Sequence, residues 1–384
     1  MKVAVLGYGT VGAGVYSMLS DAPGMEAGPV LVRPGKAVES FMVSDAALIF
    51  GDPTVDAVVE TLGGLDPAYS YGMRALEAGK HFITANKAMV ASHGLELAAL
   101  ARETGAAFLF SAACGGGVPF LHNLALSAET DRIEAVSGIL NGTTNYMLDA
   151  MQRRSLSYGD ALREAQSLGY AESDPTADVS GLDALRKMQL ACAVAFGVLP
   201  QSGMLCEGME HFTAADVEDI QSRGLVCRLL ARGSRAGESV SAYVEPVLFP
   251  RAAPESSVFT NNNMARYTGK RCGSIVLMGQ GAGRFPTASA VLRDLSAAQQ
   301  GARSMFPENC RAAEADNREA VHSYYIRTGG FAAVRLSLRS VLAQGEVVRA
   351  VTEPMSAEKM HALAQNIRKD GNDLFFAALE EELC

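Results

Sequence analysis

The chain has 384 residues, of which 48% are hydrophobic and 20% are charged, and its formal net charge is −9. This length predicts two domains and an appendage, since a domain commonly spans about 100–200 residues. The apolar content excludes a disordered or collagen-like chain. The negative charge argues against a nucleic-acid partner, which needs a clustered basic surface. No apolar run reaches the ~18–20 residues of a membrane span.

Seven cysteines are scattered along the chain, and no two of them form a Cys-x-x-Cys pair. We therefore expect neither a zinc site nor a disulfide framework, and free thiols fit the reducing cytoplasm. An apolar run follows Met1-Lys2 at once, so no signal peptide is expected. These features predict a globular cytoplasmic protein.

The first predicted element is a strand over residues 2–6, which is followed by a glycine turn and a helix with apolar residues at helical spacing. The turn reads Gly7-Tyr8-Gly9-Thr10-Val11-Gly12. In a dinucleotide site the first glycine makes a tight turn and the second lets the backbone approach the pyrophosphate. The third lets helix and strand pack closely, and the helix N-terminus attracts the phosphates. The alternative is a glycine-rich turn without a ligand.

A second strand is predicted over residues 30–32, and Arg33 follows it where an NAD site usually has an acid for the ribose hydroxyls. A guanidinium there can pair with a 2′-phosphate, so we expect NADP in preference to NAD. The alternative is that Arg33 is a solvated loop residue.

Strands and helices continue to alternate through the first 110 residues. Strands are expected over residues 55–61, 81–84 and 107–110, and helices over 68–78 and 94–104. Alternating units of this kind predict an α/β fold with a doubly wound parallel sheet.

A further strand is predicted over residues 133–140, and Asn141-Gly142 after it could be a hairpin turn. However, Thr143-Thr144 can cap a helix over residues 145–152, and no partner strand follows at once. We therefore expect a strand-to-helix turn that faces a ligand.

A long helix is predicted to begin at Ser180, with Asp183 in a capping-box-like position, and to end near Phe196. Asp183 and Lys187 are four residues apart and therefore lie on one face. An ordinary exposed ion pair is the alternative. Because the helix is apolar all round beyond Lys187, the pair is expected at the mouth of a cleft.

The segment Thr84-Ala85-Asn86-Lys87-Ala88 and a series of other blocks resemble homoserine dehydrogenase. These blocks follow the order of that family, and the likeness covers roughly residues 1–300. They are residues 58–64, 115–119, 138–146, 169–178, 181–187 and 279–288.

The resemblance implies a discontinuous Rossmann domain of residues 1–128 and 286–306. It implies an inserted α+β catalytic and dimerisation domain of residues 129–285, whose sheet forms a homodimer interface. Residues 307–384 look like a small, reduced ACT-like α+β tail.

The activity implied is the reversible oxidation of L-homoserine to L-aspartate 4-semialdehyde with NADP or NAD, in threonine and methionine biosynthesis. Lys187 would exchange a proton with the substrate hydroxyl, which it can do if burial lowers its pKa toward the operating pH. Asp183 would orient Lys187 and bind the substrate, and Lys87 would lie near the nicotinamide and the substrate.

The resemblance also implies two sets of binding residues. Those for the substrate are Glu172, which would accept its ammonium group, and Gly142, Thr143, Tyr170 and Asp178. Those for the cofactor are Gly7, Tyr8, Gly9, Thr10, Val11, Gly12, Arg33, Thr61, Lys87 and Gly281.

The loop before the triple glycine departs from the family, which usually has a glutamate where this chain has Ser111. The loop resembles one that binds a monovalent cation such as Na⁺, largely through backbone carbonyls. The corresponding residues are Ser111, Cys114, Gly116 and Val118. Losing the carboxylate weakens this site, although the carbonyls can still act as ligands.

The tail is a second departure. Its expected elements are strands over residues 323–327, 347–351 and 375–381 and helices over 332–343 and 356–370. The Asp-x-Pro-Gly ligand turn of the ACT type is absent, because Thr-Gly-Gly-Phe stands at residues 328–331. We therefore predict weak or no inhibition by threonine.

Two other functions remain open. One is a Rossmann dehydrogenase for a related amino acid, and the other is a catalytically silent NADP-binding regulatory protein. The chain keeps Glu172, Asp183 and Lys187 together, which argues against a decayed enzyme.

Overall fold

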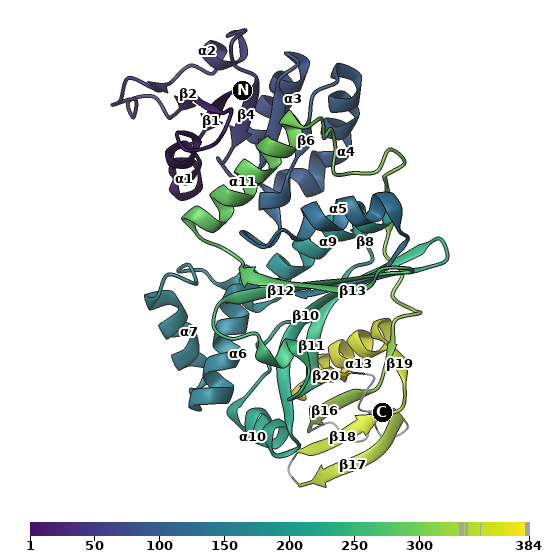
Figure 1. The fold of residues 1–384 in the computed structure, drawn as a ribbon. Coiled ribbons are helices and arrows are strands. Elements are labelled where there is room, and N and C mark those ends of the chain that lie inside the picture. The colour runs from purple at the N-terminus through teal and green to yellow at the C-terminus, as the bar shows by residue number, and fades with distance from the viewer. Residues whose placement is uncertain (330–333, 335–336, 346, 381–384) are drawn as a thin grey trace.

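The computed structural model describes residues 1–329, 334, 337–345 and 347–380, and its core lies in and around two large sheets (Figure 1). No helix within those ranges combines the length and the apolar character that crossing a membrane requires.

The first sheet is entirely parallel, and its strand order is β3-β2-β1-β4-β5-β6. The strands are β1 Lys2–Leu6, β2 Glu26–Leu31, β3 Met42–Val43, β4 Ala57–Glu60, β5 His81–Thr84 and β6 Phe108–Leu109. The direction of winding reverses between β1 and β4, and this is where doubly wound folds bind dinucleotides. The predicted Rossmann sheet is thus confirmed.

Helices cover this sheet on both sides (Figure 1). They are α1 Thr10–Leu19, α2 Ala47–Phe50, α3 Ala68–Glu77, α4 Lys87–Thr104 and α11 Arg284–Gln299. Helix α11 returns from late in the chain and packs along α1. The approach is so close at Gly14 that a Cβ there would lie 2.9 Å from the carbonyl oxygen of Arg284.

The second sheet, which we call the central sheet, is mixed and has ten strands. Their order is β13-β12-β7-β10-β11-β20-β16-β18-β17, and β9 pairs with β11. Five of its strands are β7 Ile133–Ile139, β10 Leu225–Ala236, β11 Ser239–Pro250, β12 Asn262–Gly269 and β13 Gly273–Gln280, and β13 forms one edge. Helix α9 (Leu182–Phe196) packs on β7, β10 and β11, and twelve of its residues are buried. The long apolar stretch after Lys187 therefore forms core, as the sequence pattern predicts.

The other helices of this region are α5 Phe120–Thr130, α6 Gly142–Arg154, α7 Tyr158–Ser167, α8 Thr176–Val179 and α10 Ala214–Ser222. The short elements are η1 Ser111–Ala113, η2 Pro254–Ser257, β8 Val198–Ser202, β9 Leu205–Cys206, β14 Arg311–Glu314, β15 Val321–His322 and β19 Met355–Ser356.

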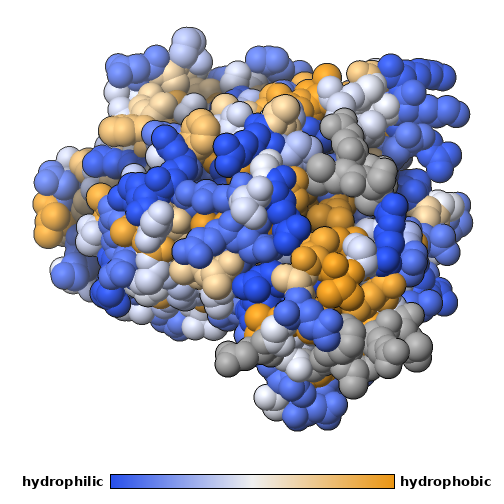
Figure 2. Space-filling view, turned by 90° about the horizontal axis from the view of Figure 1, so that it is seen from below, coloured by the Kyte–Doolittle hydropathy of each residue, from blue (hydrophilic) through white to orange (hydrophobic). Residues whose placement is uncertain are grey.

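The tail contributes β16 Tyr324–Thr328, β17 Leu338–Gln344, β18 Val348–Thr352, α13 Ala357–Lys369 and β20 Leu374–Leu379. Strand β20 pairs in parallel with β11, at Val247↔Ala378 and Leu248↔Leu379, so the tail continues the central sheet. From below, hydrophilic residues cover most of this face, with several separate hydrophobic areas between them (Figure 2).

The helix predicted over residues 332–343 is wrong in its second half, since Leu338–Gln344 forms β17 and pairs with β18. The segment contains good helix formers, but pairing with a neighbouring strand overrides that weak local preference. Most of the first half, residues 332–333 and 335–336, lies outside the described residues. The predicted helix from Ser356 forms as α13, and the Ser356 side chain caps it.

Candidate active site

The glycine turn after β1 has the geometry that a dinucleotide needs. Gly7 has a φ of +99°, which favours glycine, and a Cβ on Gly12 would lie 2.1 Å from the carbonyl oxygen of Gly7. A Cβ on Gly9 would meet no described atom within 4 Å, so this side of the turn is open. The first and third glycines thus serve packing, and the second leaves room for a close approach to the backbone.

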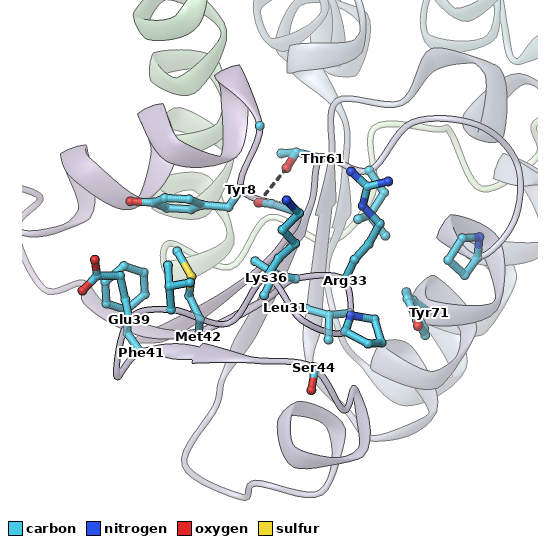
Figure 3. A pocket seen from close by; sticks show the side chains of 17 residues that line it. Tyr8, Leu31, Arg33, Lys36, Glu39, Phe41, Met42, Ser44, Thr61 and Tyr71 are labelled. Atoms are coloured by element: carbon cyan, nitrogen blue, oxygen red, sulfur yellow. Dashed lines mark hydrogen bonds between the residues drawn. The ribbon is translucent and has the colours of Figure 1, made fainter.

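A cavity of about 1050 Å³ lies beside this turn, at the carboxyl ends of β1, β2 and β4. Arg33 and Lys36 both extend from the segment after β2 toward the turn, and Thr61 donates a hydrogen bond to the Gly7 carbonyl at 3.3 Å (Figure 3). The predicted residues that line the cavity are Gly7, Tyr8, Gly9, Arg33 and Thr61. Thr10, Val11 and Gly12 begin α1 next to it.

Lys36 and Glu39 also line this cavity, although neither is among the cofactor residues expected from the sequence. The signal available for Lys36 was its position three residues after Arg33 in the same loop. Glu39 adds one carboxylate, so this end of the cavity holds two cations and one anion.

A second cavity of about 640 Å³ lies where the loops after β5 and β7, helices α8 and α9 and the loop before α11 meet. The described structure brings together every residue predicted for catalysis and substrate binding, and also Gly281. The predicted residues on its wall are Lys87, Gly142, Thr143, Tyr170, Glu172, Asp178, Asp183, Lys187 and Gly281.

A carboxylate between two ammonium groups occupies the wall of this cavity. Asp183, in the first turn of α9, lies 2.7 Å from Nζ of Lys187 and 2.7 Å from Nζ of Lys87. Lys187 also donates to the carbonyl oxygen of Leu140 at 2.6 Å. The side chain of Lys187 is 12% exposed and that of Lys87 is 33% exposed. Lys187 is therefore the more desolvated of the two cations.

The pKa of Lys187 does not follow the expectation that burial lowers it. Burial does act in that direction, but the charge and hydrogen bond of Asp183 outweigh it, and the pKa of Lys187 is raised. Burial opposes ionisation of Asp183 too, yet the charges of Lys187 and Lys87 hold the pKa of Asp183 far below its ordinary value. Without ligands, the ammonium form of Lys187 is thus strongly favoured.

Asn141 ties the two acids of the site together. Its Nδ2 donates to Asp178 at 2.7 Å and to Asp183 at 2.9 Å. Its Oδ1 accepts the N–H of Thr144 at 2.8 Å and so caps α6, which corrects the expectation that Thr143-Thr144 caps this helix. Burial, followed by the charge of Asp183, raises the pKa of Asp178. The Asn-Gly pattern signalled the turn but not this bridging role.

The start of α9 also differs from the expectation. Its N-cap is Gly181, with φ +83°, and no side chain caps the helix. The Ser180 hydroxyl is buried and has no hydrogen-bond partner in the described structure, so the predicted Ser180 cap is wrong. A Cβ on Gly181 would lie 3.1 Å from Sγ of Cys206. Close packing against Cys206 thus accompanies the glycine start.

The outer wall carries the remaining polar groups predicted for the substrate. Thr143 donates to the carbonyl oxygen of Tyr170 at 2.5 Å, and the Tyr170 ring lies edge-on to Tyr146, with the ring centres 5.1 Å apart. Glu172 is exposed, and within the described part of the chain its backbone carbonyl accepts from Gln166 while its carboxylate has no hydrogen bond. The Glu172 carboxylate is therefore free to meet an ammonium group.

In the loop after β6, the side chain of Ser111 contacts helix α11. The Ser111 backbone N–H and hydroxyl donate to Asp294 at 2.8 and 2.5 Å, and burial raises the pKa of Asp294 to about 7. Arg293 donates to the Gly117 carbonyl at 3.3 Å. The described residues hold no group of three or more His, Cys, Asp or Glu side chains suited to a metal ion. The Ser111 hydroxyl is thus engaged with Asp294, and Ser111 lacks the carboxylate that the family usually has there.

A doubly wound sheet with an open glycine turn, together with a cavity walled by a half-buried lysine and a buried aspartate, is typical of a dinucleotide-binding oxidoreductase. A model described as the NAD-binding domain of homoserine dehydrogenase matches residues 7–111, and one described as homoserine dehydrogenase matches residues 119–296. The chain belongs to the homoserine dehydrogenase family.

Individual relatives agree with this assignment. The homoserine dehydrogenase of Synechocystis is 37% identical over 319 residues, which are 77% of this chain and 72% of that protein. That of Corynebacterium glutamicum is 38% identical over 314 residues, 76% of this chain and 70% of that protein. The crystal structure of the Thiobacillus denitrificans enzyme has a TM-score of 0.87 at 30% identity, covering 99% of this chain and 98% of that one. These findings support homoserine dehydrogenase and not the two alternatives.

Proposed function

We propose that the chain catalyses the reversible NAD(P)-dependent oxidation of L-homoserine to L-aspartate 4-semialdehyde, in the biosynthesis of threonine and methionine. The observation that carries the proposal is the largely desolvated Lys187–Asp183 pair on the wall of a cavity that Glu172 also lines. A proton donor, an orienting acid and a carboxylate for an amino group are the parts that this reaction needs.

In the direction of reduction, Lys187 donates a proton from its ammonium group to the aldehyde oxygen of the substrate. In oxidation, neutral Lys187 takes the proton from the hydroxyl, so no bare alkoxide forms in a desolvated site. Asp183 holds the ammonium group in place at 2.7 Å and balances its charge. A bound nicotinamide would supply the hydride to, or accept it from, the carbon that carries this oxygen.

Charged residues that line the same cavity would recognise the amino-acid substrate. Glu172 binds the substrate ammonium group, and Lys87 adds a positive charge on the wall beside Asp183. Tyr170, Asp178 and the Gly142-Thr143 turn complete the predicted substrate contacts. A substrate without an amino group loses the attraction between its ammonium group and the Glu172 carboxylate, so we expect it to react more slowly.

For the cofactor we propose NADP in preference to NAD. Support comes from Arg33 and Lys36, which extend toward the glycine turn, since two cations fit a 2′-phosphate. The open side of Gly9 fits the close approach of a pyrophosphate.

Any monovalent cation such as Na⁺ would be held by the carbonyls of Cys114, Gly116 and Val118 alone. Comparing rates in NaCl and choline chloride tests that part.

We further propose the domain division given by the resemblance, with residues 286–306 completing the dinucleotide-binding domain, because α11 packs on α1.

A homodimer is proposed through the central sheet. Its support is that β13 is an edge strand on which Val276 and Met278 are 41% and 60% exposed. The six described cysteines are free, which supports the cytoplasm as the compartment. Light scattering of the purified chain tests the dimer.

The decisive experiment follows NADPH oxidation with L-aspartate 4-semialdehyde and with the analogue that lacks the amino group. Substrate-dependent oxidation with the first and little with the second is expected. Equal rates with both compounds would remove the proposed role of Glu172, and no turnover with either would overturn the function.

A further inference from the structure

A short segment connects the tail to the active site. We call Leu205–Met209 the strap; its first two residues form β9, which pairs with β11. The N–H of Glu207 donates to the carbonyl oxygen of Val244 at 2.8 Å, and that of Met209 donates to the carbonyl oxygen of Val179 at 2.9 Å. The strap therefore lies between the central sheet and the end of α8.

On one side, helix α13 of the tail is bound to the strap by an ion pair. Arg368, in the last turn of α13, donates to both carboxylate oxygens of Glu207, at 2.6 and 3.0 Å. Arg368 also donates to the carbonyl oxygen of Leu374 at 2.8 Å, which fixes its guanidinium relative to β20. The Glu207 side chain is only 10% exposed. A bidentate ion pair that is mostly shielded from water holds the two side chains in one relative orientation.

On the other side, the strap packs tightly against the residues that join α8 to α9. The Cys206 thiol donates to the carbonyl oxygen of Ser180 at 3.1 Å. A Cβ on Gly208 would lie 2.2 Å from the carbonyl oxygen of Val179, and one on Gly181 would lie 3.1 Å from Sγ of Cys206. Because the two segments are closely packed, a shift of the strap would displace residues 179–181.

Residues 179–181 stand directly between the two acids of the site. Asp178 precedes them and Asp183 follows them, and Asn141 bonds both acids. We infer that Arg368 and Glu207 are positioning residues for Asp183: through the strap, the tail holds the start of α9 where Asp183 meets Lys187. This inference rests on the proposed function. It gives the tail a role in turnover that needs no effector.

Disturbing this contact has a distinctive consequence for the pH profile. Asp183 raises the pKa of Lys187 against the opposing effect of burial, so a displaced Asp183 lets the pKa of Lys187 fall. The reductive rate then declines at lower pH than in the parent enzyme. Other charged or titratable groups facing the pair are Lys87, Cys114, Asp178, Glu172 and Arg186, and all of them are unchanged by the variants below.

The test uses Arg368→Met and Glu207→Gln in the full chain, with L-aspartate 4-semialdehyde and NADPH. Because a misplacement of about 1 Å can cost 10²-fold in rate, we expect kcat to fall roughly tenfold or more. The basic limb of its pH profile should move to lower pH, while the Kd for NADPH, measured by fluorescence, stays within about twofold. Arg368→Lys keeps the charge and should recover part of the rate.

Two matched controls separate positioning from general damage to the tail. Lys369→Met removes the exposed charge next to Arg368, and Tyr325→Phe removes a tail contact to Asp219 that does not involve the strap. Both should keep the parent kcat and pH profile. If Arg368→Met does not fold, Glu207→Gln decides. A folded Glu207→Gln variant with the parent kcat and pH profile overturns the inference, whereas an inactive parent chain overturns the proposed function instead.

Discussion

The ammonium group of Lys187 lies 2.7 Å from the carboxylate of Asp183, four residues earlier on the same buried helix. The spacing alone would be typical of a solvated surface pair worth a few tenths of a kcal/mol. Here the pair opens onto the cavity, and Lys187 also donates to the carbonyl of Leu140. The proposed proton transfer by Lys187 rests on this placement.

Replacing Lys187 with alanine should abolish turnover. General acid–base catalysis contributes about 10²–10⁴-fold, so we expect kcat to fall by about 10³-fold or more. NADPH binding should be spared, because the cavity beside the glycine turn is formed by other residues. Steady-state rates and NADPH fluorescence titration measure the two effects. Undiminished turnover in this variant would refute the assigned proton transfer.

Replacing Asp183 with asparagine should move the pH dependence. In the proposed mechanism, reduction needs the ammonium form of Lys187. We therefore expect the parent rate to be lost only as pH rises through a pKa above the ordinary lysine value. Asparagine removes the charge that raises this pKa and leaves burial, which lowers it. The basic limb of kcat should therefore move toward neutral pH. A profile measured from pH 6 to 10.5 checks this, and an unmoved limb would contradict the electrostatic account.

Features set by local spacing could be predicted from the sequence. The glycine turn, the shared face of Asp183 and Lys187 and the core-forming second half of α9 all follow from residues a few positions apart. The helix starts were less accurate, because caps at Gly181 and Asn141 depend on close packing and on side-chain bonds that periodicity does not encode.

Contacts between remote segments could not be predicted from local patterns. Arg368 and Glu207 are 161 residues apart, and Ser111 and Asp294 are 183 residues apart. Such partners are chosen by the three-dimensional packing of sheets and helices, which leaves no periodic signal in either segment. Family resemblance assigned site residues but did not reveal these two links, since Ser111 itself departs from the family.

Removing the two basic side chains near the glycine turn should change cofactor preference. In a variant carrying Arg33→Ala and Lys36→Ala, the KM for NADPH should rise about tenfold or more, because charge-assisted hydrogen bonds contribute about 1.5–3 kcal/mol. The KM for NADH should change little, since NADH has no 2′-phosphate. Glu39→Gln, in the same cavity, is the control and should not weaken NADPH. Equal losses for both cofactors would contradict a specific phosphate contact.

Threonine should not act as a strong inhibitor of this chain. The ACT-type ligand turn would need Asp-x-Pro-Gly, whereas this chain has Thr328 and Gly329 at the start of that position. Initial rates measured while threonine is titrated to millimolar concentrations should stay close to the uninhibited rate. Strong, saturable inhibition would show that the tail binds the amino acid by another route.

The buried Asp294 should make folding stability fall as pH rises. Its pKa in the folded state is raised to about 7, chiefly by burial, while in the unfolded chain it is ordinary. The folded state therefore holds the proton more tightly, and this contribution is complete below about pH 4 and is lost as pH rises through 7. Asp294→Asn stays neutral and still accepts from Ser111 with one oxygen. Between pH 5 and 8 the Tm of the parent chain should therefore drop more steeply than that of the variant, and parallel curves would place the carboxylate charge outside the stability balance.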